Sequence, residues 1–274
     1  MTRAQESGVP KTVGVIRVGI GGWTYEPWRG AFFPESLAHR RELEYASRKL
    51  TSIEINGTFY RTQTPSTFAK WRDETPDDFV FSVKAPRYVV QKRALAEAGE
   101  SIARFFDSGL EELGTKLGPI LWQFAPTKKF DAADFGAFLD LLPRELNGQR
   151  LRHALEVRHE SFMTEPFVAL ARAHEAAIVV AADSPHPQIG DPTASFVYLR
   201  VMGAQESKPL GYGAAALDAW AARARALSRG QEAQGIDTVA PRAGDGAARD
   251  VFFYFISGFK ARNPLAAMAL LERL

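Results

Sequence analysis

Short runs rich in β-branched and aromatic residues recur along the chain, and segments with helical spacing of apolar residues separate most of them. The runs begin at Val15, Ser52, Phe79, Pro119, His153, Ala177, Phe196 and Asp250. Strands that alternate with helices build a parallel sheet, because each crossover between parallel strands needs a connection that a helix usually supplies. Eight such units predict an α/β fold, namely a single (β/α)8 TIM barrel.

Most connecting segments carry recognisable helix starts, such as proline at the first helical position after a small polar residue. The predicted helices cover residues 67–74, 102–117, 132–146, 167–175, 214–227 and 265–274. Only residues 184–195 separate the sixth and seventh strands, which is too little chain for a helix and two turns. The sixth helix is therefore predicted to be short or missing.

The domain organisation predicted from the sequence is simple. The 274 residues, 46% of them hydrophobic, suffice for one sizeable core. We expect a flexible segment over residues 1–14, one barrel domain over 15–274, and a mobile connection over the Gly- and Ala-rich residues 228–249. The first 14 residues lack the apolar core of a signal peptide, and no run approaches the roughly 20 apolar residues of a membrane span. These features predict a cytoplasmic protein with no membrane partner.

Composition narrows the chemistry further. The chain has no cysteine, which excludes disulfides, Cys-ligated zinc and thiol nucleophiles. The formal net charge is only +2, from 34 basic and 32 acidic residues, so the overall charge gives no support for a nucleic acid partner. A local basic groove stays open as an alternative, and the sequence does not indicate the oligomeric state.

Polar side chains occupy every second position of several strands. Ile53 and Ile55 alternate with Glu54 and Asn56, and a strand turns alternate residues to opposite faces. In a (β/α)8 barrel one face packs on the helices and the other points inward, with the functional site at the carboxyl ends of the strands. The same parity selects Ser82, Lys84, Gln123, Glu156, Arg158, Tyr198 and Arg200, while Asp183 ends the sixth strand and Ser257 the eighth.

Burying a polar group without a partner costs about 2–7 kcal/mol, so the inward residues must satisfy one another or meet a ligand. The acids Glu54, Glu156 and Asp183 balance the bases Lys84, Arg158 and Arg200. Such a network can serve the structure alone, because polar layers close barrels without chemistry. Clustered titratable groups more often mark a functional site, which is the interpretation we favour.

Seven ordered motifs resemble those of the DUF72 family, also called YecE-like proteins. They are "GGWTYEPWRGAFFP" from Gly21, "IEINGTFYR" from Ile53, "WRDETPDDFVFSVKAPR" from Trp71, "KLGPILWQFAP" from Lys116, "EVRHESF" from Glu156, Asp183, and "VYLRVMG" from Val197. The resemblance implies a TIM barrel with its site at the carboxyl ends of the strands, and no established reaction. The chain departs from the family pattern at Phe33, Phe162, Ile256 and Ser257, so no role of the asparagines that usually end the last strand is carried over.

The leading functional hypothesis is hydrolase-like acid–base chemistry on a sugar-like or phosphate-bearing substrate, although the sequence leaves open whether the chain is an enzyme. Two carboxylates in different environments can have separate pKa values, so that one acts as general acid and the other as general base. The candidate catalytic residues are Glu156, Glu54, Lys84 and Asp183, with Glu156 first among them. The candidate ligand-binding residues are Trp23, Tyr25, Asn56, Tyr60, Gln123, Arg158, His159 and Arg200.

Aromatic residues follow the first two strands, and aromatic faces stack on sugars and bases. Trp23 and Tyr25 are the stronger ligand candidates, because the glycines that precede them permit a close approach of the backbone. Phe32, Phe33 and Phe59 are more simply interpreted as core between the barrel and its loops.

Two alternatives to the hydrolase hypothesis stay open. No cofactor is predicted, but carboxylates and imidazoles at strand ends are typical ligands of divalent metals in phosphodiesterase-like barrels. The residues for such a site would be Glu156, His159, Asp183 and His186. A barrel without chemistry would instead use Lys84, Arg87, Arg158, Arg200 and the aromatic residues to hold a phosphorylated ligand or a nucleic acid.

Overall fold

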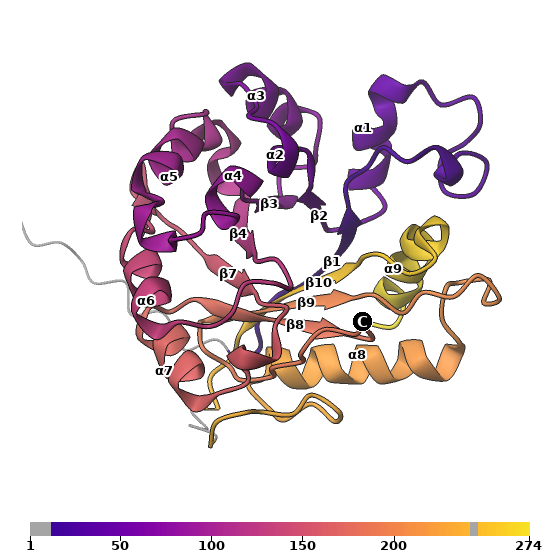
Figure 1. Ribbon diagram of the computed structural model, residues 1–274. Helices are drawn as coiled ribbons and strands as arrows, with labels where there is room; N and C mark the ends of the chain where they lie inside the picture. Colours follow the sequence, from indigo (N-terminus) through magenta and orange to yellow (C-terminus); the bar gives the residue numbers. More distant parts are fainter. Residues whose placement is uncertain (1–11, 242–245) are drawn as a thin grey trace, which may run out of the picture.

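Eight parallel strands close into a barrel in the computed structural model, which describes residues 12–241 and 246–274 (Figure 1). The barrel strands are β1 Ile16–Gly21, β2 Ser52–Ile55, β3 Val80–Lys84, β4 Leu117–Gln123, β7 His153–Glu156, β8 Ala177–Ala182, β9 Phe196–Val201 and β10 Asp250–Phe255. Each pairs with its neighbours in the closed order β1-β10-β9-β8-β7-β4-β3-β2. The predicted TIM barrel and all eight predicted strands are confirmed.

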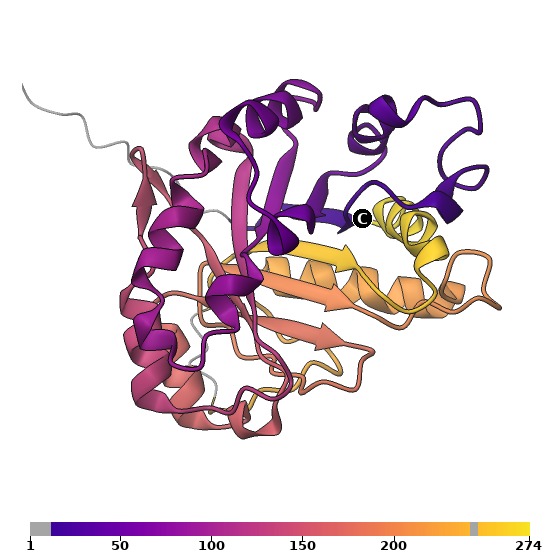
Figure 2. The same cartoon turned by 45° about the horizontal axis from the view of Figure 1, so that its top comes forward.

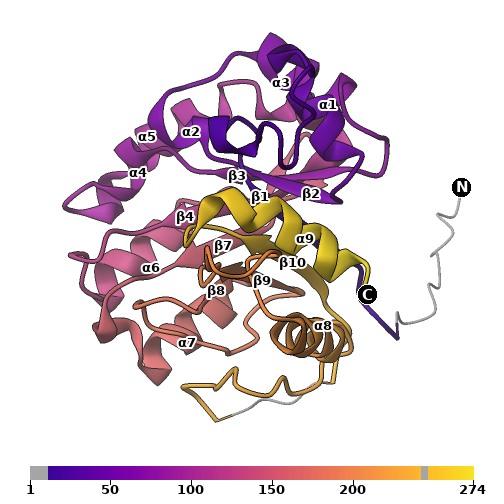
Figure 3. The ribbon, with the colours of Figure 1, turned by 90° about the vertical axis from the view of Figure 1, so that its right-hand side faces the viewer.

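Helices surround the barrel, as the view from the carboxyl ends of the strands shows (Figure 3). They are α1 Glu42–Ser47, α2 Gly57–Tyr60, α3 Pro65–Asp73, α4 Arg87–Val90, α5 Gly99–Phe106, α6 Ala132–Asp140, α7 Glu165–Ala173, α8 Ala214–Ser228 and α9 Asn263–Leu271. Short 3-10 turns add η1 Glu26–Trp28, η2 His39–Arg41, η3 Leu95–Glu97, η4 Leu110–Lys116, η5 Glu160–Phe162 and η6 Lys260–Arg262, and a hairpin joins β5 Glu145–Leu146 to β6 Gln149–Arg150. None of the helices in the described ranges is long and apolar enough to cross a membrane.

The predicted first residues of the helices agree with the structure better than the predicted last residues do. The side chain of Asp131 accepts a hydrogen bond from the Asp134 N–H at 3.0 Å, which caps α6. Two predicted helices are too long, however. The helix expected over 102–117 breaks at Gly109, whose φ of 101° is left-handed, and continues only as the 3-10 turn η4. The helix expected over 132–146 ends at Asp140, because Pro143 cannot continue it and the chain turns into β5.

Two separate apolar layers explain the alternation of residues along the strands. Ile53 and Ile55 are buried in the layer between the strands and the helices. Leu121, Val179 and Phe252 belong to a second cluster, which fills the barrel interior. The inward faces therefore change along the barrel axis from an apolar interior to the polar residues of the carboxyl ends, where the arrowheads of Figure 2 point. The predicted parity of Glu54 is confirmed.

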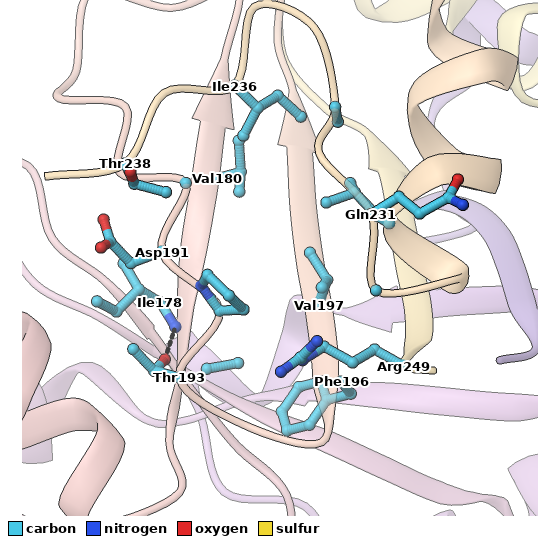
Figure 4. A pocket seen from close by; sticks show the side chains of 16 residues that line it. Ile178, Val180, Asp191, Thr193, Phe196, Val197, Gln231, Ile236, Thr238 and Arg249 are labelled. Carbon is cyan, nitrogen blue, oxygen red and sulfur yellow. Dashed lines mark hydrogen bonds between the residues drawn. The ribbon is translucent and has the colours of Figure 1, made fainter. Parts of the chain in front are cut away.

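The prediction that the sixth helix is short or missing is also confirmed, because the connection from β8 to β9 contains no helix. The chain that follows α8 lies outside these strands instead, and Ile236 faces the outer side chains of Ile178, Val180 and Val197 across a cavity of about 70 Å³ (Figure 4). Residues 1–11 of the predicted flexible segment and residues 242–245 of the predicted mobile connection lie outside the described residues.

Asp191 ties this chain segment to the barrel. Its two buried carboxylate oxygens accept hydrogen bonds from the backbone N–H groups of Val239 at 2.6 Å and Ala240 at 3.0 Å. The backbone adds a contact in the other direction, because the Gly190 N–H donates to the Asp237 carbonyl at 2.9 Å. The Asp191 carboxylate therefore helps to hold the chain segment that covers the outer face of β8 and β9, where a sixth helix would otherwise lie.

We predict that Asp191→Ala lowers the free energy of unfolding by about 2 kcal/mol, because one buried and one partly buried N–H donor lose their acceptor. Chemical denaturation of the wild type and the variant measures this change. The matched control is Asp237→Ala, which removes an exposed carboxylate of the same segment and should change stability by less than about 0.5 kcal/mol. Equal effects of the two substitutions would contradict the anchoring role of Asp191.

Candidate functional site

A single guanidinium connects three strands at the carboxyl end of the barrel. Arg200 of β9 donates to both carboxylate oxygens of Glu54 on β2, through Nε and Nη2, each at 3.0 Å. Its third nitrogen, Nη1, donates to Oε2 of Glu156 on β7 at 2.5 Å. Glu54 and Glu156 are completely buried and Arg200 is 3% exposed. Arg200 therefore bridges two buried carboxylates from strands that are not neighbours.

The remaining acceptor positions of the two carboxylates are also used. The Tyr198 hydroxyl donates to Glu54 Oε2 at 2.7 Å. Arg158 Nε donates to Glu156 Oε1 at 2.8 Å, and Gln123 Nε2 donates to Glu156 Oε2 at 2.8 Å. Each of the four carboxylate oxygens thus accepts at least one hydrogen bond from another side chain. We call Glu54, Lys84, Gln123, Glu156, Arg158, Tyr198 and Arg200 the mouth network.

The ion pairs keep Glu156 ionised. Burial by itself would raise the pKa of Glu156, but the neighbouring guanidinium groups of Arg200 and Arg158 outweigh it and lower this pKa to about 2. For Arg200, the favourable charges of Glu156 and Glu54 exceed the opposing effect of burial and raise its pKa above the ordinary value. Glu156 is consequently a carboxylate that carries no proton to donate near neutral pH.

Two tyrosines lie beside these charges inside the barrel. The hydroxyl of Tyr198 contacts Ser82 Oγ at 2.8 Å, and the hydroxyl of Tyr254 contacts Ser52 Oγ at 2.7 Å. Burial raises the pKa of both tyrosines well above the usual value, so both hydroxyls stay protonated. Ser52 and Tyr254 are not among the predicted site residues, although the period of two that selects Glu54 also selects Ser52.

Lys84 differs from the other charged members of the mouth network because its amine has no hydrogen-bond partner in the part of the chain that the structure describes. The residue ends β3 and is 7% exposed, and its Nζ lies 4.2 Å from the ring centroid of Phe59. Burial and then the charge of Arg200 lower the pKa of Lys84 to about 8, against a partial opposing effect of Glu54 and Glu156. Lys84 is therefore the member that titrates near neutral pH.

The expected balance of three acids and three bases does not hold in the structure. Asp183 follows β8 as an exposed residue, next to Gly203 and Tyr212, and makes no hydrogen bond to the mouth network within the described residues. Its peptide has a left-handed φ of 52°, which turns the chain away after the strand. Within the mouth network, the two acids Glu54 and Glu156 thus face the three bases Lys84, Arg158 and Arg200.

The two histidines considered as metal ligands, His159 and His186, have different surroundings. His159 caps the turn η5, where its Nδ1 accepts a hydrogen bond from the Ser161 N–H at 3.1 Å. His186 lies close enough to the mouth network that, after burial, the charge of Arg158 is the next cause that lowers its pKa. No group of three or more His, Asp and Glu residues in the described ranges is arranged to hold a metal ion. Glu156, His159, Asp183 and His186 are therefore not gathered into one ligand set.

The predicted ligand-binding residues after the first two strands occupy different surroundings. Trp23 packs edge-on against Trp71 at 5.2 Å, in the layer between barrel and helices, whereas Tyr60 is 67% exposed. Asn56 donates weakly to the Glu54 carbonyl at 3.5 Å, and Lys260 covers the ring of Tyr25 at 4.3 Å.

Phe32 and Phe33 are buried core, as expected, while Phe59 is only partly buried and contacts Lys84. The ring of Phe59 thus contacts the mouth network at Lys84.

Comparison with known families identifies the chain. The model of the family described as "Protein of unknown function DUF72" matches residues 17–274. The chain belongs to the DUF72 family. Two relatives carry names without a function: the UPF0759 protein YecE of Escherichia coli (strain K12), 29% identical over 154 residues, and the UPF0759 protein YunF of Bacillus subtilis (strain 168), 27% identical over 159 residues.

These DUF72 relatives match the chain only in part. The YecE match covers 55% of this chain and 51% of YecE, and the YunF match covers 56% and 54%, so the chain spans about half the length of the relatives. Solved structures of DUF72 proteins match this chain over more of its length. The DUF72 protein of Thermotoga maritima MSB8 has a TM-score of 0.71 at 21% identity and covers 94% of this chain and 98% of its own. That of Enterococcus faecalis V583 has a TM-score of 0.68 at 16% identity and covers 96% and 98%. These structures share the barrel fold.

We predict that Arg200→Met lowers the free energy of unfolding by about 3–5 kcal/mol, because it leaves two buried carboxylates without their main cation. Urea denaturation measures the loss. The control is Arg41→Met, which removes an exposed arginine paired with Glu44 at 2.8 Å and should leave stability close to that of the wild type. A stable Arg200→Met protein with wild-type denaturation would refute the bridging role assigned to Arg200.

Proposed function

We propose that this DUF72 protein is an enzyme that acts on a small substrate with a phosphate or other anionic group, held at the carboxyl end of the barrel. The observation that carries the proposal is the excess of positive charge in the mouth network. Arg200 pairs with both Glu54 and Glu156, and Arg158, whose side chain is 22% exposed, pairs with Glu156. The amine of Lys84 has no carboxylate partner in the described chain, so three cations face two acids. An anion would supply the negative charge that Lys84 lacks, and it would also meet the exposed part of Arg158, whose guanidinium Glu156 already pairs.

The reaction we propose is hydrolysis, or a related acid–base reaction, of a phosphate-bearing or sugar-like substrate. An acid–base catalyst works best when its pKa is near the operating pH. Lys84, with a pKa of about 8, meets this condition, whereas Glu156, with a pKa of about 2, does not. The proton exchange is therefore assigned to Lys84, and Glu54 and Glu156 are assigned the role of holding Arg200 and Arg158 in place.

A specific surface feature favours a second candidate, a barrel that binds a nucleic acid or another polyanion without chemistry. The loops that follow β3 and β4 form a groove lined by Gln91, Lys92, Arg93, Thr127, Lys128 and Lys129. Lys128 is neutralised by Asp134 at 2.7 Å, which leaves Lys92, Arg93 and Lys129 as the groove's cations for phosphate groups. Binding of this kind weakens steeply with salt, because each phosphate contact releases counterions.

The test of the leading proposal uses glucose 6-phosphate and glucose, which differ only in the phosphate group. We expect glucose 6-phosphate, and not glucose, to raise the melting temperature of the wild type. Loss of one charged hydrogen bond corresponds to a roughly 10- to 100-fold weaker Kd, so Arg158→Met should lose most of the shift. Arg41→Met, at an exposed site, should retain it.

Turnover separates the two candidate functions. A panel of phosphomonoesters, phosphodiesters and glycosides is assayed with the wild type and Lys84→Met, and an enzyme of the proposed kind loses its activity in the variant. Phosphate-dependent binding without any turnover would leave only the binding barrel. An equal thermal shift with glucose, or a shift that Arg158→Met does not reduce, would refute the anion site.

A further inference from the structure

We infer that the amine of Lys84 forms a covalent imine with an aldehyde or ketone group of a ligand bound at the mouth network. The inference deepens the proposed function, because it names carbonyl compounds that also carry an anionic group as the substrate class. It rests on the anion site for the position of the ligand and on the surroundings of one lysine for the chemistry.

A second buried lysine in the same protein shows how unusual Lys84 is. Lys116 is also 7% exposed, but its Nζ donates to the carbonyl of Arg72 at 2.6 Å, to the carbonyl of Thr75 at 2.8 Å and to the Thr75 hydroxyl at 3.2 Å. These three acceptors replace the water that an ammonium loses on burial. Lys84 is equally buried and has no such acceptor within residues 12–241 and 246–274.

The missing acceptors of Lys84 follow from the arrangement of the carboxylates. Glu54 and Glu156 are the acids whose charges favour the protonated form of Lys84. Their four oxygens, however, already accept hydrogen bonds from Arg200, Arg158, Tyr198 and Gln123. Arg200 and Arg158 also repel a positive charge at Lys84. A lysine that is desolvated and placed next to other cations is poised to lose its proton and act as a nucleophile.

Lys84 is held in place and its amine is reachable. Its backbone ends a paired strand, and its carbonyl accepts a hydrogen bond from the Thr58 hydroxyl at 2.7 Å. The ring of Phe59 covers one side of the amine at 4.2 Å. The amine makes no hydrogen bond to a described residue and is not fully enclosed, so it reaches solvent. A ligand anchored by Arg158 would therefore meet the amine from the open side.

The chemistry balances without an oxidant or reductant. The lone pair of Lys84 Nζ attacks the carbonyl carbon, and the π electrons of the C=O bond move to oxygen. The two N–H hydrogens then leave with that oxygen as one water molecule, and a C=N bond replaces the C–N single bond and the C–O bond. The imine, once protonated, draws electrons from the neighbouring carbon atoms, which activates them for proton abstraction or bond cleavage.

Pyridoxal 5′-phosphate is the probe that tests this inference, because it joins an aldehyde to a phosphate group. The full-length protein is incubated with the probe at pH 7 and treated with borohydride, which reduces an imine to a stable amine, and the modified lysines are located by peptide mass spectrometry. A pKa of about 8 instead of 10.5 gives Lys84 a neutral fraction on the order of 100-fold larger than that of an ordinary lysine. We expect Lys84 to be labelled at least about tenfold more than any other lysine.

Internal and matched controls make the result decisive. Lys116 serves as the internal control, since it is as buried as Lys84 but fully hydrogen-bonded, and should stay unlabelled. Labelling of Lys84 should rise with pH around a midpoint of about 8, whereas labelling of exposed lysines should still be low there. Lys84→Arg keeps the positive charge but lacks the amine, so it should lose the visible absorbance of the imine while retaining the wild-type circular dichroism.

Pyridoxal without phosphate separates the failure of this inference from the failure of the proposed function. Preferential labelling of Lys84 by both probes, with no advantage for the phosphate, would support the imine and refute the anion site. A thermal shift with inorganic phosphate but no preferential adduct at Lys84 would support the anion site and overturn the imine. Labelling spread evenly over surface lysines, with Lys84 no different from Lys116, would also overturn it.

Discussion

The forked contact of Arg200 with Glu54 and Glu156 is the interaction on which the chemistry of this barrel depends. It links β9 to β2 and to β7, three strands that are not adjacent in the closed sheet, and so it crosses the barrel interior. Removing such ions from water is costly, and the cost is recovered only when the geometry satisfies every donor and acceptor. Tyr198, Gln123 and Arg158 complete that geometry around the two carboxylates.

The saturation of the carboxylates determines which group is left to react. A pair of buried glutamates in a barrel invites comparison with acid–base hydrolases, but the guanidinium groups hold Glu156 in its ionised form. Within the mouth network, the charged group that makes no hydrogen bond to any described residue is the amine of Lys84, and burial, followed by the charges of Arg200 and Arg158, makes its positive form unfavourable. The same guanidinium groups therefore keep the Glu156 carboxylate ionised and add to the effect of burial that lowers the pKa of Lys84. This is the reason for assigning Lys84 the central role.

Much of this organisation could be predicted from the sequence, because a period of two is a strong physical signal. The alternation of Ile53 and Ile55 with Glu54 fixed both the strand and the face that points into the barrel, and the short chain between the sixth and seventh strands excluded a helix there. What the periodicity could not give is the path of the chain beyond a strand end. Asp183 follows β8 with a left-handed φ of 52° and makes no hydrogen bond to the mouth network within the described residues.

Local signals also failed where packing or glycine geometry decides the outcome. The apolar spacing over 102–117 is helical throughout, but Gly109 adopts a backbone conformation that ends the helix. Trp23 follows two glycines, and its ring contacts Trp71 and Phe81, which the local sequence could not show. The pairing of the charges could not be predicted either. The sequence gives the acidic and basic residues, but it does not show that Arg200 forms ion pairs with both Glu54 and Glu156.

The most direct test of this account is an NMR titration of the side chains of Lys84 and Glu156 in the folded protein, with signals assigned by Lys84→Arg and Glu156→Gln. The account predicts that the Lys84 amine titrates with a midpoint near pH 8 and that the Glu156 carboxylate stays ionised until the pH falls toward about 2. A Lys84 midpoint at the ordinary value near 10.4, together with protonation of Glu156 at or above its ordinary value near 4.3, would contradict it.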